Sequence, residues 1–174
     1  NQYPRDPLFG CVNDARRWQE TLAALGFQAR TLLNVDGVTL LAELGALIRE
    51  SRPGDQLVFQ FAGHGTQAPD LDGDETGGDT PGLDEALCPI DFRSGNLIID
   101  DDLRRLFADL PEGAGLTCFF DCCHSGTITR LAGHRGAGLL PGERARFVSL
   151  TPEEQAAFVE RRKQQPAPRS TVLT

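Results

Sequence analysis

Two short apolar runs, each followed by a polar motif, constrain this chain more than any other feature of its sequence. Residues 57–61 read Leu-Val-Phe-Gln-Phe and lead into Gly63-His64-Gly65, and residues 116–120 read Leu-Thr-Cys-Phe-Phe and lead into Asp-Cys-Cys-His-Ser-Gly at 121–126. Both runs are short, largely apolar and β-prone, which is typical of strands buried on both faces of a parallel sheet. The sequence therefore predicts two buried strands with a polar motif at the end of each.

Helical patterns and turn signals separate these strands. Apolar residues at helical spacing predict helices at residues 13–25, 38–51 and 100–110, and a capping box predicts a fourth at 151–163. Asn13 is expected to cap the first helix, and the Thr-Pro-Glu-Glu run at 151–154 is a capping box for the last. Residues 27–33 are predicted to form another strand, and residues 68–87, which lack periodicity, a long loop. This alternation predicts an α/β fold with a mostly parallel sheet flanked by helices.

The ends of the two buried strands are where chemistry is expected. In such folds ligands bind beyond the carboxyl ends of the strands, so His64 and Cys123 share one edge of the sheet and face one cleft if their strands are neighbours. A cysteine thiolate can attack a carbonyl carbon, while a histidine takes up and returns the proton. The N–H groups of Gly65 and Cys123 could bind the developing oxyanion. His124 is a poorer base, because a chain neighbour is badly placed to share a proton with Cys123.

Composition narrows the classes of partner. The 174 residues are 40% hydrophobic, enough for one hydrophobic core, and carry a formal net charge of −8. This acidic balance argues against nucleic acid as a bulk partner and fits a cationic ligand, a metal or a basic peptide. No apolar run approaches the roughly 18 residues that span a bilayer, so no membrane partner is expected. Five cysteines without a secretion signal indicate a reduced, cytoplasmic protein.

Five ordered sequence blocks resemble those of metacaspases, the caspase-fold cysteine endopeptidases whose bacterial members are also called orthocaspases. The blocks are GCVNDA at 10–15, FAGHGTQ at 61–67, LDEALCPID at 83–91, IDDDL at 99–103 and DCCHSG at 121–126. The resemblance implies a caspase-like three-layer fold, with residues 1–130 as the p20-like catalytic region. Residues 131–174 are expected to be a basic linker and helix leading toward a p10-like portion that is not present in the chain.

The same resemblance implies a catalytic dyad of His64 and Cys123 and cleavage of peptide bonds after Arg or Lys. It places the acids of the P1 pocket at Asp14 and Asp121. A planar guanidinium suits a fork of two carboxylates, and strand alternation puts the side chains of Asp121 and Cys123 on one face. The expected partners are therefore proteins or peptides with a basic P1 residue, and the sequence predicts no particular oligomeric state.

Calcium activates many metacaspases, and the acids that match its site are Asp84, Asp100 and Asp101. Clustered oxygen ligands suit calcium. Arg130, however, stands where calcium-dependent members have a further Asp. We therefore expect that no cofactor is required.

A basic segment and two rival functions remain open. An Arg-specific protease could cut itself in this segment, where the candidate positions are Arg135, Arg144, Arg146, Arg161, Arg162, Lys163 and Arg169. The first rival is a caspase-fold regulatory or binding module without turnover. The second is a metal-binding protein, either through the acidic residues of 70–102 or through a zinc site. That zinc site would use Cys118, Cys122, Cys123 and His124, which lack CxxC spacing.

Overall fold

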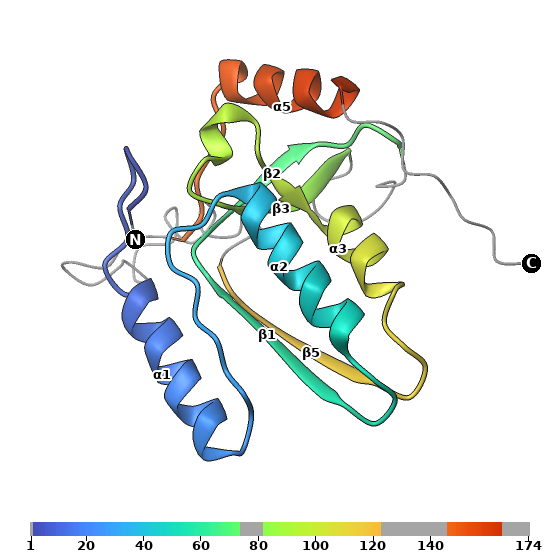
Figure 1. Cartoon of the computed structure of the whole chain (residues 1–174). Coiled ribbons are helices and arrows are strands. Elements are labelled where there is room, and N and C mark those ends of the chain that lie inside the picture. Colours follow the sequence, from blue (N-terminus) through green and yellow to red (C-terminus); the bar gives the residue numbers. More distant parts are fainter. Residues whose placement is uncertain (1, 74–81, 123–145, 165–174) are drawn as a thin grey trace, which may run out of the picture.

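The computed structural model describes residues 2–73, 82–122 and 146–164 (Figure 1). Its helices are α1 (Cys11–Ala24), α2 (Gly37–Glu50), the short 3-10 helix η1 (Phe92–Ser94), α3 (Asp100–Phe107) and α5 (Pro152–Gln164). Its strands are β1 (Gln56–Ala62), β2 (His64–Pro69), β3 (Leu83–Cys88), β4 (Ile98–Ile99) and β5 (Gly115–Asp121). All four predicted helices are therefore present.

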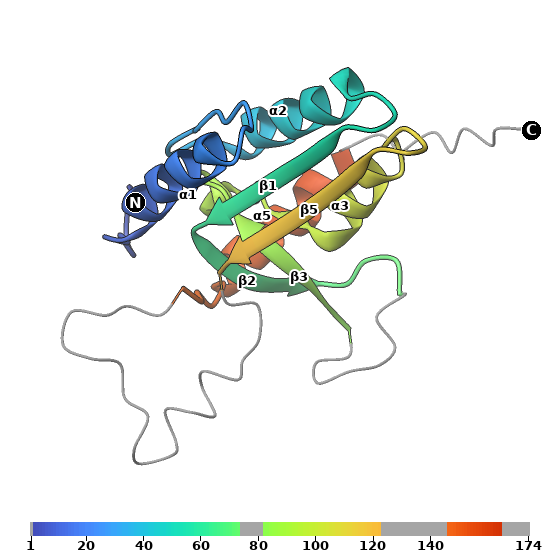
Figure 2. The same ribbon diagram turned by 90° about the horizontal axis from the view of Figure 1, so that it is seen from below.

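The two predicted buried strands are neighbours. β1 and β5 pair in parallel over their whole length, from Gln56 opposite Gly115 to Ala62 opposite Asp121. Both arrowheads lie at the same edge in Figure 2. Phe61 of β1 packs with the buried leucines of α2. Phe119 of β5 stacks on Trp18 of α1, with ring centroids 4.5 Å apart. Helices therefore flank a parallel sheet, and the predicted α/β fold class is confirmed.

A second sheet, which the sequence did not predict, follows directly from β1. Its strand order is β2-β3-β4, and all its pairings are antiparallel. His64 lies opposite Cys88 and Pro69 opposite Leu83. The prediction of one long loop over residues 68–87 is therefore wrong at its ends. β2 reads His-Gly-Thr-Gln-Ala-Pro and β3 reads Leu-Asp-Glu-Ala-Leu-Cys, so neither has an apolar run or a strict alternation that would mark a strand.

Three local predictions are also corrected. α1 begins at Cys11, and Gly10 precedes it without a side-chain cap, so Asn13 lies inside the helix. Residues 27–33 run without a strand partner among the described residues, and side-chain bonds such as Thr31 to Gln19 (3.0 Å) hold them against α1. β5 is not buried on both faces, because Phe119 and Phe120 are 41% and 39% exposed.

Helix α5 closes the core on the side of the antiparallel sheet. The capping box is confirmed: Glu154 N–H donates to the Thr151 hydroxyl at 3.3 Å, and Thr151 N–H donates to the Glu154 carboxylate at 3.0 Å. Phe158 is fully buried in a cluster with Phe92 and Tyr3. No helix within the three described ranges is long and apolar enough to cross a bilayer.

Candidate active site

The end of β1 and the end of β5 form one edge, as the sequence predicts. Gly63 N–H, just after β1, donates to the carbonyl of Asp121 at 3.4 Å. His64 is the next residue, and Cys123 follows Asp121 by two positions. Cys123 and His124 lie outside the described residues. The contact between the Cys123 sulfur and His64, and the oxyanion role of the Cys123 N–H, therefore stay predictions.

His64 is held by the main chain of the N-terminal segment. Its side chain is buried, and its Nε2 lies 2.7 Å from the carbonyl oxygen of Asp6. A carbonyl only accepts, so Nε2 carries the proton and Nδ1 of the neutral ring keeps its lone pair. Nδ1 is buried and makes no hydrogen bond to the described residues. Burial lowers the pKa of His64 below its ordinary value, although the nearby carbonyls of Asp6 and Arg146 partly oppose that shift. This arrangement suits a neutral base.

Tyr3 supports the same histidine from behind. Its hydroxyl donates to the Cys88 carbonyl at 2.8 Å and accepts the His64 N–H at 3.2 Å, and its ring lies 4.6 Å from the imidazole. A Cβ on Gly63 would lie 2.6 Å from this hydroxyl and 2.7 Å from the Phe61 ring. Only glycine fits between the strand and Tyr3, so at this position the glycine is required by internal packing.

The two predicted P1 acids meet around one guanidinium. Asp14 lies in the first turn of α1 and Asp121 at the end of β5. Nη2 of Arg146 lies 2.5 Å from Asp14 Oδ2. Nη1 of Arg146 contacts the carboxylate of Asp121 and also donates to the main-chain carbonyl of Asp121 at 2.9 Å. Burial alone would lower the pKa of Arg146, but the bond to Asp14 and nearby negative charges raise it. We call Asp14 and Asp121 the acid pair; their geometry matches a pocket for a basic side chain.

The main chain beside Arg146 contacts the predicted oxyanion donor. Gly65 N–H donates to the carbonyl of Arg146 at 2.7 Å. The Gly65 carbonyl accepts the N–H of Val148 at 3.1 Å, so Gly65 and Phe147 form a parallel bridge. The group that the sequence assigns to the oxyanion is therefore engaged by the carbonyl of a basic residue in the same chain.

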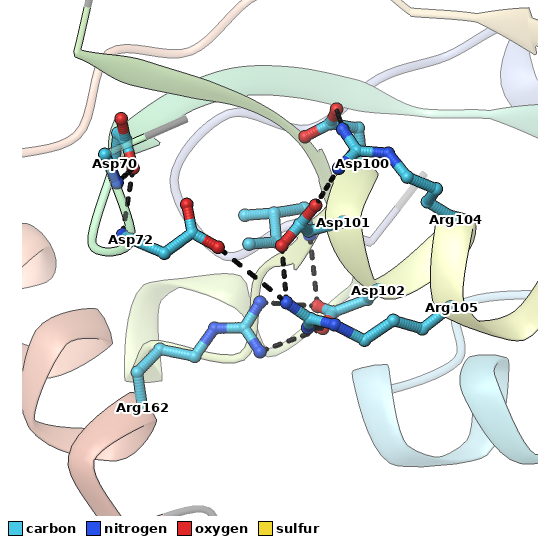
Figure 3. Close-up of polar contacts among 10 residues, drawn as sticks. Asp70, Asp72, Asp100, Asp101, Asp102, Arg104, Arg105 and Arg162 are labelled. Carbon is cyan, nitrogen blue, oxygen red and sulfur yellow. Dashed lines mark hydrogen bonds and ion pairs between the residues drawn. The ribbon is translucent and has the colours of Figure 1, made fainter. Parts of the chain in front are cut away.

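The predicted calcium ligands lie in a separate acidic cluster. Asp84 of β3 belongs to it, and the charges of four other acids act on this carboxyl. These acids are Asp70 and Asp72 after β2 and Asp100 and Asp101 of α3 (Figure 3). Asp84 is buried, and this burial, with the charge of the neighbouring acids, raises its pKa to about 7. One buried oxygen of Asp100 has no partner among the described residues.

Arginines already engage most of this acidic cluster. Nη2 of Arg104 lies 3.1 Å from Oδ2 of Asp100, and Nη1 of Arg104 lies 2.5 Å from Oδ1 of Asp101. Arg105 also contacts Asp101 and approaches Asp72 at 4.0 Å. Among the described residues, no three Asp, Glu, His or Cys side chains are placed to hold a metal ion. As they stand these residues do not form a metal site, and calcium ligation by Asp84, Asp100 and Asp101 stays a prediction.

Three of the other cysteines, Cys11, Cys88 and Cys118, have no features of a nucleophile. Cys11 and Cys88 are buried, and burial raises the pKa of both thiols and of Cys118 above the ordinary value. A raised pKa keeps a thiol protonated near neutral pH and so unreactive. The zinc alternative has two of its four members, Cys123 and His124, outside the described residues.

A family profile described as metacaspase, peptidase C14 domain, matches residues 1–132. The chain belongs to the metacaspase family. Metacaspase-1 of Coccidioides immitis is 35% identical over 140 residues, which cover 73% of this chain and 29% of that protein. Metacaspase-2 of Trypanosoma brucei brucei is 35% identical over 139 residues, which cover 71% of this chain and 38% of that protein.

This metacaspase domain thus spans less than two fifths of the length of either relative. Among solved structures, it resembles a protein of Geobacter sulfurreducens, with a TM-score of 0.67 and 26% identity, over 91% of this chain and 57% of that one. That likeness agrees with the α/β arrangement described above.

Three features of this metacaspase site were not predicted from the sequence. The Asp6 carbonyl could not be, because a main-chain atom leaves no mark in residue identity. Tyr3 is the single tyrosine of the chain, but nothing around it indicates its contact with His64. Arg146 was one of several basic candidates for self-cleavage, and no sequence signal separates it from the others.

Proposed function

We propose that this chain carries the catalytic machinery of a cysteine endopeptidase that cuts peptide bonds after Arg or Lys. The observation that supports this most directly is the binding of the Arg146 guanidinium between Asp14 and Asp121, beside the edge that holds His64. Two carboxylates that grip one guanidinium within the fold have the chemistry needed to grip the P1 side chain of a substrate. Membership of the metacaspase family supports the peptidase class.

In the proposed reaction, the Cys123 thiol gives its proton to Nδ1 of His64 and attacks the carbonyl carbon of the P1 residue. His64 then protonates the leaving amine, and water hydrolyses the acyl-enzyme with His64 as base. The Nε2–H of His64 stays on the Asp6 carbonyl and keeps the ring oriented. The N–H groups of Gly65 and Cys123 stabilise the oxyanion, each worth about 3 kcal/mol in comparable sites.

The test is a panel of fluorogenic peptides that differ only at P1, with Arg, Lys, Asp or Ala, under reducing conditions. We expect hydrolysis of the Arg and Lys peptides and none by a Cys123→Ala or His64→Gln variant. Asp14→Asn and Asp121→Asn should each lower kcat/KM for the Arg peptide at least tenfold. Glu20→Gln, which removes an exposed acid farther along α1, is the matched control and should leave it unchanged.

Two outcomes would contradict the proposal. Equal turnover of the Arg and Ala peptides would remove the basic P1 preference. Binding of the Arg peptide without any hydrolysis would favour the rival function, a caspase-fold binding module without turnover.

A further inference from the structure

A tyrosine hydroxyl bridges two main-chain groups at the residue that carries the proposed base. His64 is the first residue of β2, and its register partner in β3 is Cys88. The hydroxyl of Tyr3 accepts the N–H of His64 at 3.2 Å and donates to the carbonyl of Cys88 at 2.8 Å. Tyr3 therefore joins the two strands at His64.

The main-chain groups of the next residue show which way those of His64 face. Gly65 uses its N–H and its carbonyl for the parallel bridge to residues 146–148, on the side of β2 opposite to β3. Successive residues of a strand turn these groups to opposite sides, so the N–H of His64 faces β3. In a regular ladder it would donate to Cys88, and here the Tyr3 hydroxyl bonds both groups.

Packing fixes the position of this hydroxyl. Tyr3 is only 8% exposed, and its ring centroid lies 5.9 Å from that of Phe92 and 4.6 Å from that of His64. A Cβ on Gly63 would lie 2.6 Å from the hydroxyl, so no larger residue fits beside it. Burial raises the pKa of Tyr3 well above its ordinary value, so the hydroxyl keeps the proton that it donates.

We propose that Tyr3 is a positioning residue, whose hydroxyl sets the main chain of His64 and through it the place of the imidazole. This inference rests on the proposed function, because His64 is the base of that reaction. The Asp6 carbonyl holds the far end of the ring at Nε2. Tyr3 and Asp6, which lie in one N-terminal segment, thus fix the two ends of the same residue.

Loss of the hydroxyl should displace His64 and spare the P1 pocket. The His64 N–H and the Cys88 carbonyl belong to buried residues, and buried main-chain groups are costly to leave unpaired. The start of β2 should therefore move toward β3 until the two groups bond directly. The acid pair lies on α1 and β5, so it should keep its place.

The first test compares Tyr3→Phe with Ser51→Ala in turnover of the Arg peptide. Ser51 is the matched control because its hydroxyl also donates to a main-chain carbonyl, that of Ile48 at 2.7 Å. It precedes β1, whereas His64 follows the other end of that strand. We expect Tyr3→Phe to lower kcat about tenfold and to leave KM within about twofold of the wild type. Ser51→Ala should change neither constant.

The second test does not depend on turnover. Nitrogen NMR distinguishes the two neutral tautomers of histidine, and a His64→Gln variant identifies the signals of His64. We expect the Nε2–H tautomer alone in the wild type and in Ser51→Ala, because Nε2 donates to the Asp6 carbonyl at 2.7 Å. In Tyr3→Phe the displaced ring should lose this fixed acceptor and show both tautomers.

A fluorinated tyrosine gives a variant that keeps both the ring and the hydroxyl. Tyr3 is the single tyrosine of the chain, so 3,5-difluorotyrosine supplied during growth replaces this residue alone. Fluorine makes the hydroxyl a weaker acceptor for the His64 N–H, and we expect kcat to fall about twofold at unchanged KM. This variant decides the test if circular dichroism shows that Tyr3→Phe is unfolded, and a wild-type kcat would then overturn the inference.

The outcomes separate this inference from the function on which it rests. A folded Tyr3→Phe chain that keeps either the wild-type kcat or the Nε2–H tautomer alone overturns the inference, and turnover by the wild type leaves the function standing. A loss that appears in KM alone, or equally in Ser51→Ala, also overturns it. A wild type that hydrolyses no peptide overturns the proposed function, and the tautomers then decide whether Tyr3 positions the ring.

Discussion

At the scale of single residues, the environment of His64 decides which form of the imidazole the site holds. The ring is buried against Tyr3 and donates from Nε2 to a carbonyl, and no described carboxylate contacts it. Burial without a carboxylate partner disfavours the imidazolium. In the proposed reaction, the ring would be neutral before substrate binds and charged only while it carries the proton of the thiol.

We predict that His64 titrates below about 6.5, the ordinary value for histidine. Burial lowers its pKa, so the unfolded chain binds a proton more readily and this group destabilises the fold as pH falls below that ordinary value. Nitrogen NMR of the Cys123→Ala form would measure it, with the signal of His64 identified among the three histidines by a His64→Gln variant. A titration at or above the ordinary value would contradict the prediction.

Asp84 should show the opposite pH dependence. Burial and neighbouring acids raise its pKa to about 7, so the folded chain favours the protonated form and loses stability as pH rises from 4 toward 7. Asp84→Asn should therefore raise the thermal midpoint at pH 8, in EDTA. The corresponding gain in the free energy of unfolding should be about 1–2 kcal/mol. A tenfold change in proton affinity corresponds to about 1.4 kcal/mol, and screening by nearby solvent reduces the effect.

That gain should shrink as the pH approaches 4. Glu85→Gln, at the next and exposed position of β3, is the matched control and should show no such pattern. A gain in Asp84→Asn that is the same at both pH values would contradict the assigned cause.

At the scale of elements, the contact between η1 and α5 depends on one glycine. Gly95 has a φ of 84°, and a Cβ there would lie 2.7 Å from the backbone carbonyl of Ala157 in α5. Gly113 has a nearly equal φ of 85°, but its Cβ would meet nothing closer than 3.5 Å. The two positions carry the same backbone strain and differ only in what surrounds them.

We predict that Gly95→Ala destabilises the chain more than Gly113→Ala does. Both variants incur the left-handed strain, of about 1 kcal/mol, and only the first must also move α5, at a further cost of about 1–3 kcal/mol. Urea unfolding of both variants measures the difference. Equal losses would show that α5 is not held at this distance.

Elements that depend on neighbouring residues were predicted well, and those that depend on distant partners were not. The capping box at Thr151 lies within four residues, and the structure confirms it. The segment 27–33 has strand-like composition but no partner strand among the described residues, and composition cannot supply one. β2 and β3 were not predicted because neither sequence has a regular strand pattern and their pairing spans the residues between them.

The candidate site divides in the same way. His64 was predicted from the motif at the end of its strand, and the acid pair from the family resemblance. The sequence left open whether the two strands are neighbours, and the structure shows that β1 and β5 pair. The bond from Arg146 to Asp14 joins residues 132 positions apart. Only the folded chain shows which of several arginines makes that contact.

At the scale of the whole molecule, the chain has a net charge of −8, and several of its acidic side chains form ion pairs with arginines. Arg104 and Arg105 engage acids of α3, and Arg162 of α5 reaches Asp102, so charge pairing joins two helices that are far apart in sequence (Figure 3). Arg104 and Arg105 therefore already offset the charges of Asp100 and Asp101, which a bound cation would otherwise neutralise.

We predict that calcium is not needed by this chain. Millimolar calcium should leave the thermal midpoint of the wild type within about 1 °C, and EDTA should leave turnover of the Arg peptide unchanged. Replacing Arg104 and Arg105 together by Gln frees their acids, and calcium should then raise the midpoint by several degrees, on the scale expected for a ligand that binds only the folded state.

Magnesium is the control, because it fits flexible oxygen sites poorly. A wild type that calcium stabilises, and an Asp84→Asn variant that it does not, would contradict the prediction and restore the ligand set inferred from the family.

The acceptor that orients His64 is a peptide oxygen, and this places it beyond the reach of conventional mutagenesis. Every amino acid at position 6 supplies the same oxygen, so alanine there would break the contact with Arg93 yet leave the imidazole tethered. An alanine scan would therefore measure only the loss of the ion pair between Asp6 and Arg93 at this position. Such a scan of the proposed site would identify the Cys123 and His64 side chains and would miss the Asp6 carbonyl that orients the imidazole.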